Sequence, residues 1–174
     1  MTSSFADNAL ELDLVGDYAV LTLNQPAKRN AMTKAMWMAL PQVCAVIEAA
    51  QEVKVLVVRG AGDHFAAGAD ISEFEIVYGT REAATAYRAN VAAGVEALAT
   101  LSKPTIAMIS GVCVGGGMAL ALACDLRIAA TNARFGITPA RLGIVYGLAD
   151  TKRLVDAVGP SAAKNILYTG EIVG

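Results

Sequence analysis

The sequence predicts one α/β domain in which buried strands alternate with helices, and three observations predict it. First, "VKVLVVRG" (53–60) and "PTIAMIS" (104–110) have the apolar runs of strands that are buried on both faces, as in a parallel sheet. Second, segments with helical spacing of apolar residues separate these strands. Third, the 174 residues contain no linker and no low-complexity segment, so we expect a single domain over 1–174.

The first third of the chain predicts a hairpin and a helix. "LELDLV" (10–15) and "YAVLTLN" (18–24) alternate in polarity on either side of Gly16-Asp17, which is typical of a β-hairpin. Thr33 follows a loop and is expected to cap a helix. Pro41 lies inside that helix and predicts a kink or an early end. The face expected to be buried holds Met36, Trp37, Leu40, Val43, Cys44 and Ile47.

The remaining chain continues the alternation. "AGDHFAAGADI" (61–71) is a loop that ends at a helix start near Asp70. A long helix is expected from about Arg81 to Leu101, with Tyr87, Val91, Val95 and Leu98 on its apolar face. After the strand at 104–110 we expect a triglycine turn with its helix, a strand at 125–130, a loop-rich segment at 133–147, and helices near 150–158 and 161–168.

Composition narrows the classes of function. The chain is 55% hydrophobic and 17% charged, and its net charge of −2 gives no electrostatic attraction to nucleic acid. The N-terminus lacks the basic and apolar regions of a secretory signal. Cys44, Cys113 and Cys124 form no CxxC pair, so we expect reduced, buried thiols and a cytoplasmic protein.

The uncharged stretch between Lys103 and Asp125 is nominally long enough to span a membrane. It contains Pro104, Ser110 and four glycines, however, and a β-branched run precedes its glycine break. This pattern favours a buried strand, a turn and a buried helix over one continuous helix. We therefore expect no membrane association.

Three glycines in "GVCVGGGMALALACD" (111–125) suggest a ligand held by the main chain. A strand that turns through glycines into a helix leaves the first N–H groups of that helix free at its positive end. Such a terminus binds an anion or a developing oxyanion. A P-loop requires Gly-Lys-Ser/Thr, whereas Met118 and Ala119 follow these glycines, and the GxGxxG spacing is also absent. The alternative is that the glycines only allow the strand and helix to pack closely.

"HFAAGADI" (64–71) places a second glycine in a loop just before a helix start. Two such loops in one domain can supply two N–H donors to one oxygen, which is the pattern of an oxyanion hole. No His, Cys or Asp cluster has the spacing of metal ligands, so we expect no metal.

Four ordered motifs carry a family resemblance: "LTLNQPAKRNAM", "VLVVRGAGDHFAAGADI", "KPTIAMISGVCVGGGMALALACDLRIAA" and "ARFGITPARLG". With them the chain resembles the enoyl-CoA hydratase/isomerase (crotonase) superfamily over essentially its whole length. The resemblance implies a ClpP/crotonase-like spiral of ββα repeats and an acyl-CoA thioester as substrate. It also implies a homotrimer or a dimer of trimers, and no cofactor beyond the coenzyme A moiety of the substrate.

The resemblance assigns site residues by position. The two amides that stabilise a thioester enolate would be those of Ala69 and Gly116. Lys28 or Arg29 would lie near the phosphates or the adenine of coenzyme A. Contacts to the bound thioester would also come from the loop that follows Phe65, through Ala67, Gly68, Asp70 and Ile71.

Two positions depart from the family's hydratases, which carry a glutamate at each. This chain has Ala119 and Pro139 there, and neither side chain can hold a proton. General acid–base catalysis contributes a factor of about 10² to 10⁴ per group. We therefore favour chemistry in which the enolate forms without removal of a proton, such as decarboxylation, or a divergent lyase or isomerase reaction.

The stretch "ITPARLGIVYG" also resembles the family's decarboxylases, in which a tyrosine stands at the position of Tyr146. Tyr146 would orient a substrate carboxylate or protonate the enolate. Against this, those enzymes carry histidine where this chain has Ala69. The alternatives are a hydratase with substitute groups such as Glu73 or Glu75, a catalytically silent acyl-CoA-binding homologue, and a structural component of an oligomer.

Other polar residues are given simpler roles. His64 is expected to be an exposed loop residue, and Asp125 to organise the start of a strand. Arg141 could pair with a substrate carboxylate or with a helix end, and Cys113 is expected to pack. The chain ends at "TGEIVG" (169–174), where family members continue with further helices, so we expect a C-terminally truncated domain.

Overall fold

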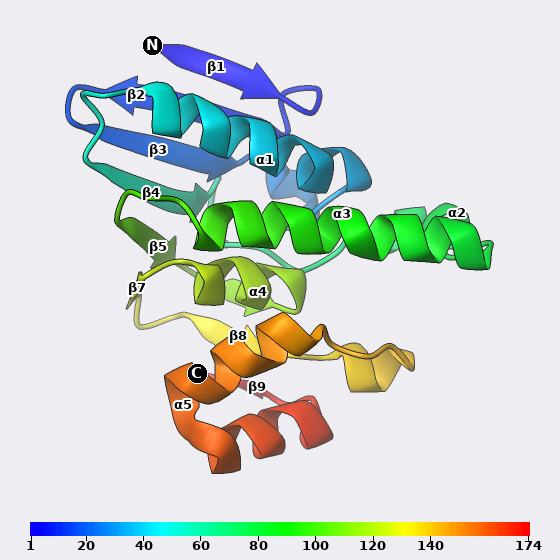
Figure 1. Ribbon diagram of the computed structural model, residues 1–174. Helices are drawn as coiled ribbons and strands as arrows, with labels where there is room; N and C mark the ends of the chain where they lie inside the picture. The colour runs from blue at the N-terminus through cyan, green and yellow to red at the C-terminus, as the bar shows by residue number, and fades with distance from the viewer.

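The computed structural model describes residues 1–174 and contains two sheets (Figure 1). The larger sheet has six strands in the order β1-β2-β3-β4-β5-β7. Their bounds are β1 Thr2–Phe5, β2 Leu10–Val15, β3 Tyr18–Leu23, β4 Val55–Gly60, β5 Thr105–Ile109 and β7 Leu126–Ala129. The smaller sheet has the order β6-β8-β9, with bounds β6 Val112–Val114, β8 Arg134–Gly136 and β9 Ile172–Val173.

Five α-helices and three short 3-10 helices connect the strands. The α-helices are α1 Lys34–Ala49, α2 Phe74–Val77, α3 Arg81–Ala99, α4 Gly116–Ala123 and α5 Leu148–Thr169. The 3-10 helices are η1 Pro26–Lys28, η2 Ile71–Glu73 and η3 Pro139–Leu142. Figure 1 shows α1, α3 and α4 side by side over one face of the larger sheet, with α5 beyond α4. The α/β class is therefore confirmed.

Strand pairing follows the prediction for the larger sheet. Val15 pairs with Tyr18 across the predicted hairpin, and the pairs β3–β4, β4–β5 and β5–β7 are all parallel. The expectation that strand 53–60 is buried on both faces was wrong in part. Leu56 and Val58 are buried under the helices, but Val55 and Val57 on the other face are only half-buried, because no helix of the chain covers that face.

Four short strands were not predicted. These are β1, β6, β8 and β9, each of two to four residues. Such segments are too short to show an alternation of polarity, and they pair only because the surrounding loops bring them together. β6 is the one that matters for the site, because it lies between β5 and the triglycine turn.

Helix α1 begins as predicted but does not end early. The Thr33 side chain accepts a hydrogen bond from the Met36 amide at 3.2 Å, and the helix then runs for 16 residues through Pro41. Pro41 lacks the N–H that would bond to the Trp37 carbonyl. Gly94 of α3 packs against that carbonyl so closely that a Cβ atom on it would lie 2.7 Å away. Packing by α3 thus protects the carbonyl that Pro41 leaves without a donor.

The other predicted helices are confirmed with small shifts of their ends. Helix α5 contains a break at Gly159, whose φ of 78° separates the two helical segments expected near 150–158 and 161–168. The stretch between Lys103 and Asp125 forms β5, β6 and α4. No helix in the structure has both the length and the apolar character needed to cross a membrane.

Candidate active site

A cavity of about 320 Å³ lies at the N-terminus of α4. Helix α3 forms one wall, and the segment from Thr138 to Asp150 forms another. Most of its lining is apolar, and this suits a site that binds an acyl chain. The lining residues that the sequence had singled out are Trp37, Ala67, Gly68, Ala69, Ile71, Tyr87, Val91, Gly115, Gly116, Ala119, Pro139 and Tyr146.

The two glycine loops are held together by short pieces of parallel pairing. Ala66 donates to the Val112 carbonyl at 2.9 Å and accepts from the Val114 amide at 3.0 Å. A Cβ atom on Gly68 would lie 3.1 Å from the Val114 carbonyl oxygen and 3.5 Å from the Gly116 nitrogen. The backbones therefore approach so closely that a glycine at position 68 is favoured, and its φ of 101° also favours one.

Ala69 is oriented by a second pairing, with Met32. The Met32 amide donates to the Gly68 carbonyl at 2.7 Å, and its carbonyl accepts from the Asp70 amide at 2.9 Å. Because these bonds use the residues on either side of Ala69, the N–H of Ala69 itself points away from Met32.

The amides of Ala69 and Gly116 are both unpaired within the chain. Gly116 is the first residue of α4, where an N–H has no partner inside the helix. A Cβ atom on Gly116 would lie 3.6 Å from the Ala69 nitrogen, so the two donors are neighbours beside the same cavity. The arrangement can donate two hydrogen bonds to one oxygen atom.

Trp37 forms the base of this arrangement. Its side chain is 1% exposed, and a Cβ atom on Gly116 would lie 2.9 Å from its Cζ2 atom. The indole ring therefore fixes how deep the start of α4 can lie. Sequence reasoning placed Trp37 only in the core, because helical spacing does not distinguish a core position from a pocket wall.

Tyr146 reaches the triglycine turn. Its hydroxyl donates to the Gly115 carbonyl at 3.4 Å, and it lines the cavity. Burial raises the pKa of the Tyr146 phenol far above its usual value, and the nearby carboxyl of Asp150 raises it further. The hydroxyl therefore keeps its proton at neutral pH and can act as a hydrogen-bond donor.

Besides Arg88 of α3, the sequence analysis missed one further charged residue of the cavity lining, Asp150. It lines the cavity from the first turn of α5, and burial raises the pKa of its carboxyl, although Arg153 opposes this effect. At the level of sequence, Asp150 and Arg153 are spaced as an ordinary surface ion pair on a helix. Only the fold, which brings α5 against the 138–147 segment, puts the carboxyl at the cavity.

The predicted contacts to coenzyme A divide into two groups. Ala67, Gly68 and Ile71 line the cavity. Lys28 and Asp70 instead pair with each other at 2.6 Å, outside the cavity.

Asp70 is buried and serves as the predicted cap, since its carboxylate accepts from the Ser72 amide at 3.0 Å. Burial raises its pKa, but hydrogen bonds from Lys28 and Ser72 outweigh burial and lower the pKa overall. Arg29, with a left-handed φ of 50°, is exposed and likewise lies outside the cavity.

The substitute acids considered from the sequence do not reach the cavity. Glu73 accepts a hydrogen bond from the Lys34 amide at 2.6 Å and so caps α1, and Glu75 is exposed. Neither lines the cavity, whereas Ala119 and Pro139 do. The cavity thus has no glutamate, and Asp150 is its one carboxyl group.

The remaining polar residues have structural roles. His64 is half-buried rather than exposed, because its Nδ1 accepts from the Val112 amide at 3.3 Å. Arg141 lies against Gly170 at the end of α5, so the structure favours the helix-end alternative.

Burial raises the pKa of the Cys113 thiol to about 12, which agrees with packing. Asp125 accepts from the amide and hydroxyl of Thr105 and so fixes the start of β5.

The fold and the two neighbouring free amides define a class of α/β proteins in which the main chain can donate two hydrogen bonds to one oxygen atom. A model of the enoyl-CoA hydratase/isomerase family matches residues 16–174. The chain is 36% identical over 156 residues to the crotonyl-CoA hydratase of Syntrophomonas wolfei, covering 89% of this chain and 59% of that protein. It is 36% identical over 165 residues to the short-chain-enoyl-CoA hydratase of Clostridium acetobutylicum, covering 94% and 62%.

A solved structure agrees with this match. An enoyl-CoA hydratase/isomerase family protein from Hyphomonas neptunium superposes with a TM-score of 0.93 at 47% identity, over 95% of this chain and 63% of that one. The chain belongs to the enoyl-CoA hydratase/isomerase family. It spans about three fifths of the length of the curated relatives that it matches.

Proposed function

We propose that this protein acts on an acyl-CoA thioester by stabilising its enolate in a backbone oxyanion hole. The observation that carries the proposal is the pair of unpaired amides of Ala69 and Gly116 beside one apolar cavity. Donors that are fixed before the reaction stabilise negative charge as it develops on the thioester oxygen. Membership of the family supports the choice of a thioester as substrate.

The reaction that we favour is decarboxylation of a malonyl-type acyl-CoA. The bond between the α-carbon and the carboxylate breaks, CO₂ leaves, and its electron pair moves onto the thioester as an enolate. One proton then adds to the α-carbon and gives the shorter acyl-CoA. Forming the enolate in this way removes no proton, and this suits a cavity with Ala119 and Pro139 in its wall. Tyr146 would orient the substrate carboxylate or supply the proton.

Mass spectrometry of a small acyl-CoA panel tests this proposal, with methylmalonyl-CoA and crotonyl-CoA in separate reactions. We expect methylmalonyl-CoA to lose the mass of CO₂. Binding of coenzyme A without any change of mass would instead indicate a silent acyl-CoA-binding homologue.

Hydration of an enoyl-CoA is the second candidate, and two observations favour it. The curated relatives are named hydratases, and Asp150 places one carboxyl at the cavity. A hydratase adds water across a double bond and needs a group that gives and takes a proton. A gain of the mass of water by crotonyl-CoA in the same panel would support this reaction over decarboxylation.

We also propose that the protein assembles with copies of itself. Met108, Leu126 and Ile128 on the outer face of the larger sheet are 47%, 59% and 61% exposed. An apolar surface of this kind is typical of a protein interface. Light scattering is expected to give a mass above that of the monomer, and a trimer is the state that the family resemblance implies. A monomer at micromolar concentration would contradict the proposal.

A further inference from the structure

We propose that Asp150 is the proton-transfer group of this cavity, giving a proton to the α-carbon of the enolate or taking one from it. The inference rests on the proposed enolate chemistry and adds the residue that would complete it. Two features of the structure carry it: how the carboxyl is held, and which of its oxygens is left free.

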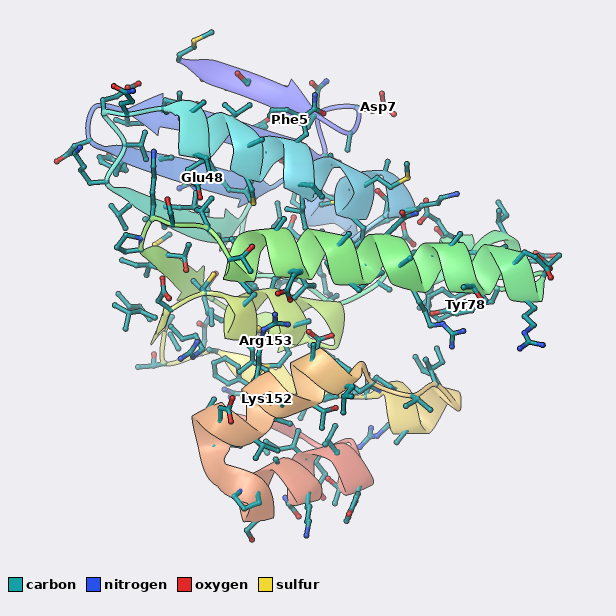
Figure 2. The ribbon with its side chains drawn as sticks, viewed as in Figure 1. Phe5, Asp7, Glu48, Tyr78, Lys152 and Arg153 are labelled. Atoms are coloured by element: carbon teal, nitrogen blue, oxygen red, sulfur yellow. The ribbon has the colours of Figure 1, made fainter.

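Only one of the two carboxylate oxygens of Asp150 accepts a hydrogen bond from the chain. Its Oδ1 accepts from Nη1 of Arg153 at 3.1 Å, and Nη2 of Arg153 in turn pairs with Oε2 of Glu96 at 2.6 Å. Glu96 belongs to α3, so the pair ties the first turn of α5 to a second helix. Figure 2 shows Arg153 at the side of α5 that faces α3 and α4. Asp150 is 14% exposed and Arg153 is 21% exposed, so this pairing is shielded from solvent.

The second oxygen, Oδ2, accepts no hydrogen bond from the chain and is not fully buried, and Asp150 is one of the residues that line the cavity. Gly147 is the residue next to it, and a Cβ atom at this position would lie 2.9 Å from Oδ2. The backbone of Gly147 has a φ of −61°, which any residue can adopt. A side chain at position 147 would therefore have to displace the free oxygen, and the absence of one leaves space beside Oδ2.

Asp150 is also connected, through Tyr146, to the backbone that carries the Gly116 amide. Its charge acts on the Tyr146 phenol, and that phenol donates to the Gly115 carbonyl, one residue before the Gly116 donor. Burial raises the pKa of Asp150 from its ordinary value, so its protonated form is easier to populate than that of a surface aspartate.

The proposed step balances in both directions. As an acid, the protonated carboxyl breaks its O–H bond and forms the new C–H bond at the α-carbon, and solvent then restores its proton. As a base, the carboxylate takes the α-proton of a saturated acyl-CoA and leaves the electron pair on the thioester oxygen. In deuterated water the base reaction, run in reverse, returns a deuteron to the α-carbon.

Exchange of the α-protons of butyryl-CoA in deuterated water tests Asp150 without depending on the net reaction. We expect Asp150→Asn to slow exchange at least 100-fold, within the range of general acid–base catalysis. Asp156→Asn is the matched control, since Asp156 lies on the same helix and pairs only with the exposed Lys152. The control should exchange within about twofold of wild type.

Gly147→Ala is a second variant that leaves the carboxyl in place. Its methyl group is expected to displace Oδ2 and to slow exchange at least tenfold, with far-ultraviolet circular dichroism unchanged. Wild-type exchange by Asp150→Asn would overturn the role of Asp150, as would a wild-type protein that binds butyryl-CoA and exchanges nothing. A third outcome separates the two proposals. If Asp150→Asn loses exchange but wild type removes no CO₂ from methylmalonyl-CoA, the role of Asp150 in proton transfer is supported and only the decarboxylation proposal is rejected.

Discussion

A side-chain carbon on Gly116 would lie 2.9 Å from Cζ2 of Trp37, closer than packed atoms tolerate. The absence of a side chain at Gly116 is thus what lets α4 begin against the indole ring, with its first amide beside that of Ala69. Trp37 and Gly116 both line the cavity, so this contact forms part of its wall.

Gly116→Pro removes the N–H itself, because proline has no amide hydrogen. We expect kcat to fall by about 10² to 10³, the cost typical of one lost oxyanion donor. Gly116→Ala is the matched control, because its methyl group makes the same close approach to Trp37 but leaves the N–H in place, and it should lose clearly less activity than Gly116→Pro. Steady-state kinetics on the substrate found with the acyl-CoA panel make the comparison. Equal losses in the two variants would reject the role of the Gly116 amide.

Tyr146→Phe removes one hydroxyl and keeps the ring. The variant loses the donor to the Gly115 carbonyl and any contact to a substrate carboxylate, so we expect kcat to fall about 10- to 100-fold. The melting temperature should stay nearly unchanged, because a bond of 3.4 Å contributes little to folding. A variant that retains full turnover would leave Tyr146 as a packing residue only.

Lys28→Ala tests the ion pair that supports the loop before η2. Asp70 is 5% exposed at its side chain, and its pKa is lowered, so the pair stabilises the fold when the carboxyl is ionised. We expect a loss of about 1–2 kcal/mol in the free energy of unfolding at pH 7.

This stabilisation is present above the unfolded pKa of an aspartate, about 4, and is lost as the pH falls through the lower folded pKa. Urea titrations at several pH values should therefore show the two proteins converging in acid. A difference in stability that grows as the pH falls would contradict this account.

Asp150→Asn is expected to become more stable relative to wild type as the pH rises, whereas Lys28→Ala becomes less stable relative to wild type. The raised pKa of Asp150 means that the folded state binds its proton more tightly than the unfolded state. The wild type therefore loses stability as the pH rises from about 4 through that raised pKa, and the asparagine variant does not. Thermal melts from pH 4 to pH 7 should show the variant gaining on the wild type. Such a gain alongside lost activity is typical of an active-site residue. A variant that falls further behind as the pH rises would show that the Arg153 pairing dominates.

Sequence reasoning was reliable where a local pattern decides the structure. The parallel strands, the Thr33 cap, the two glycine loops and the break at Gly159 all depend on a few neighbouring residues, and the structure confirms them. It failed where distant segments meet. Helix α1 continues through Pro41, and the carbonyl that this proline leaves without a donor packs against Gly94, which is 53 positions further along the chain.

The candidate site shows the same division. The two glycine loops predicted a pair of converging N–H donors, and the family resemblance assigned these donors to Ala69 and Gly116. Asp150 was missed because nothing in its own neighbourhood distinguishes it from a surface aspartate. Glu73 and Glu75 were considered because they lie near the loop in sequence, yet the fold turns both away from the cavity.

The most direct test of the central claim is the carbon-13 NMR shift of a thioester carbonyl bound to the protein. Butyryl-CoA labelled at its carbonyl carbon would be measured free, bound to wild type, and bound to Gly116→Pro. Two hydrogen bonds to the oxygen should polarise the carbonyl and move its resonance downfield in the wild-type complex, with much of that shift lost in the variant. A bound resonance at the position of the free thioester, with binding confirmed, would contradict the proposal that these amides hold the reacting oxygen.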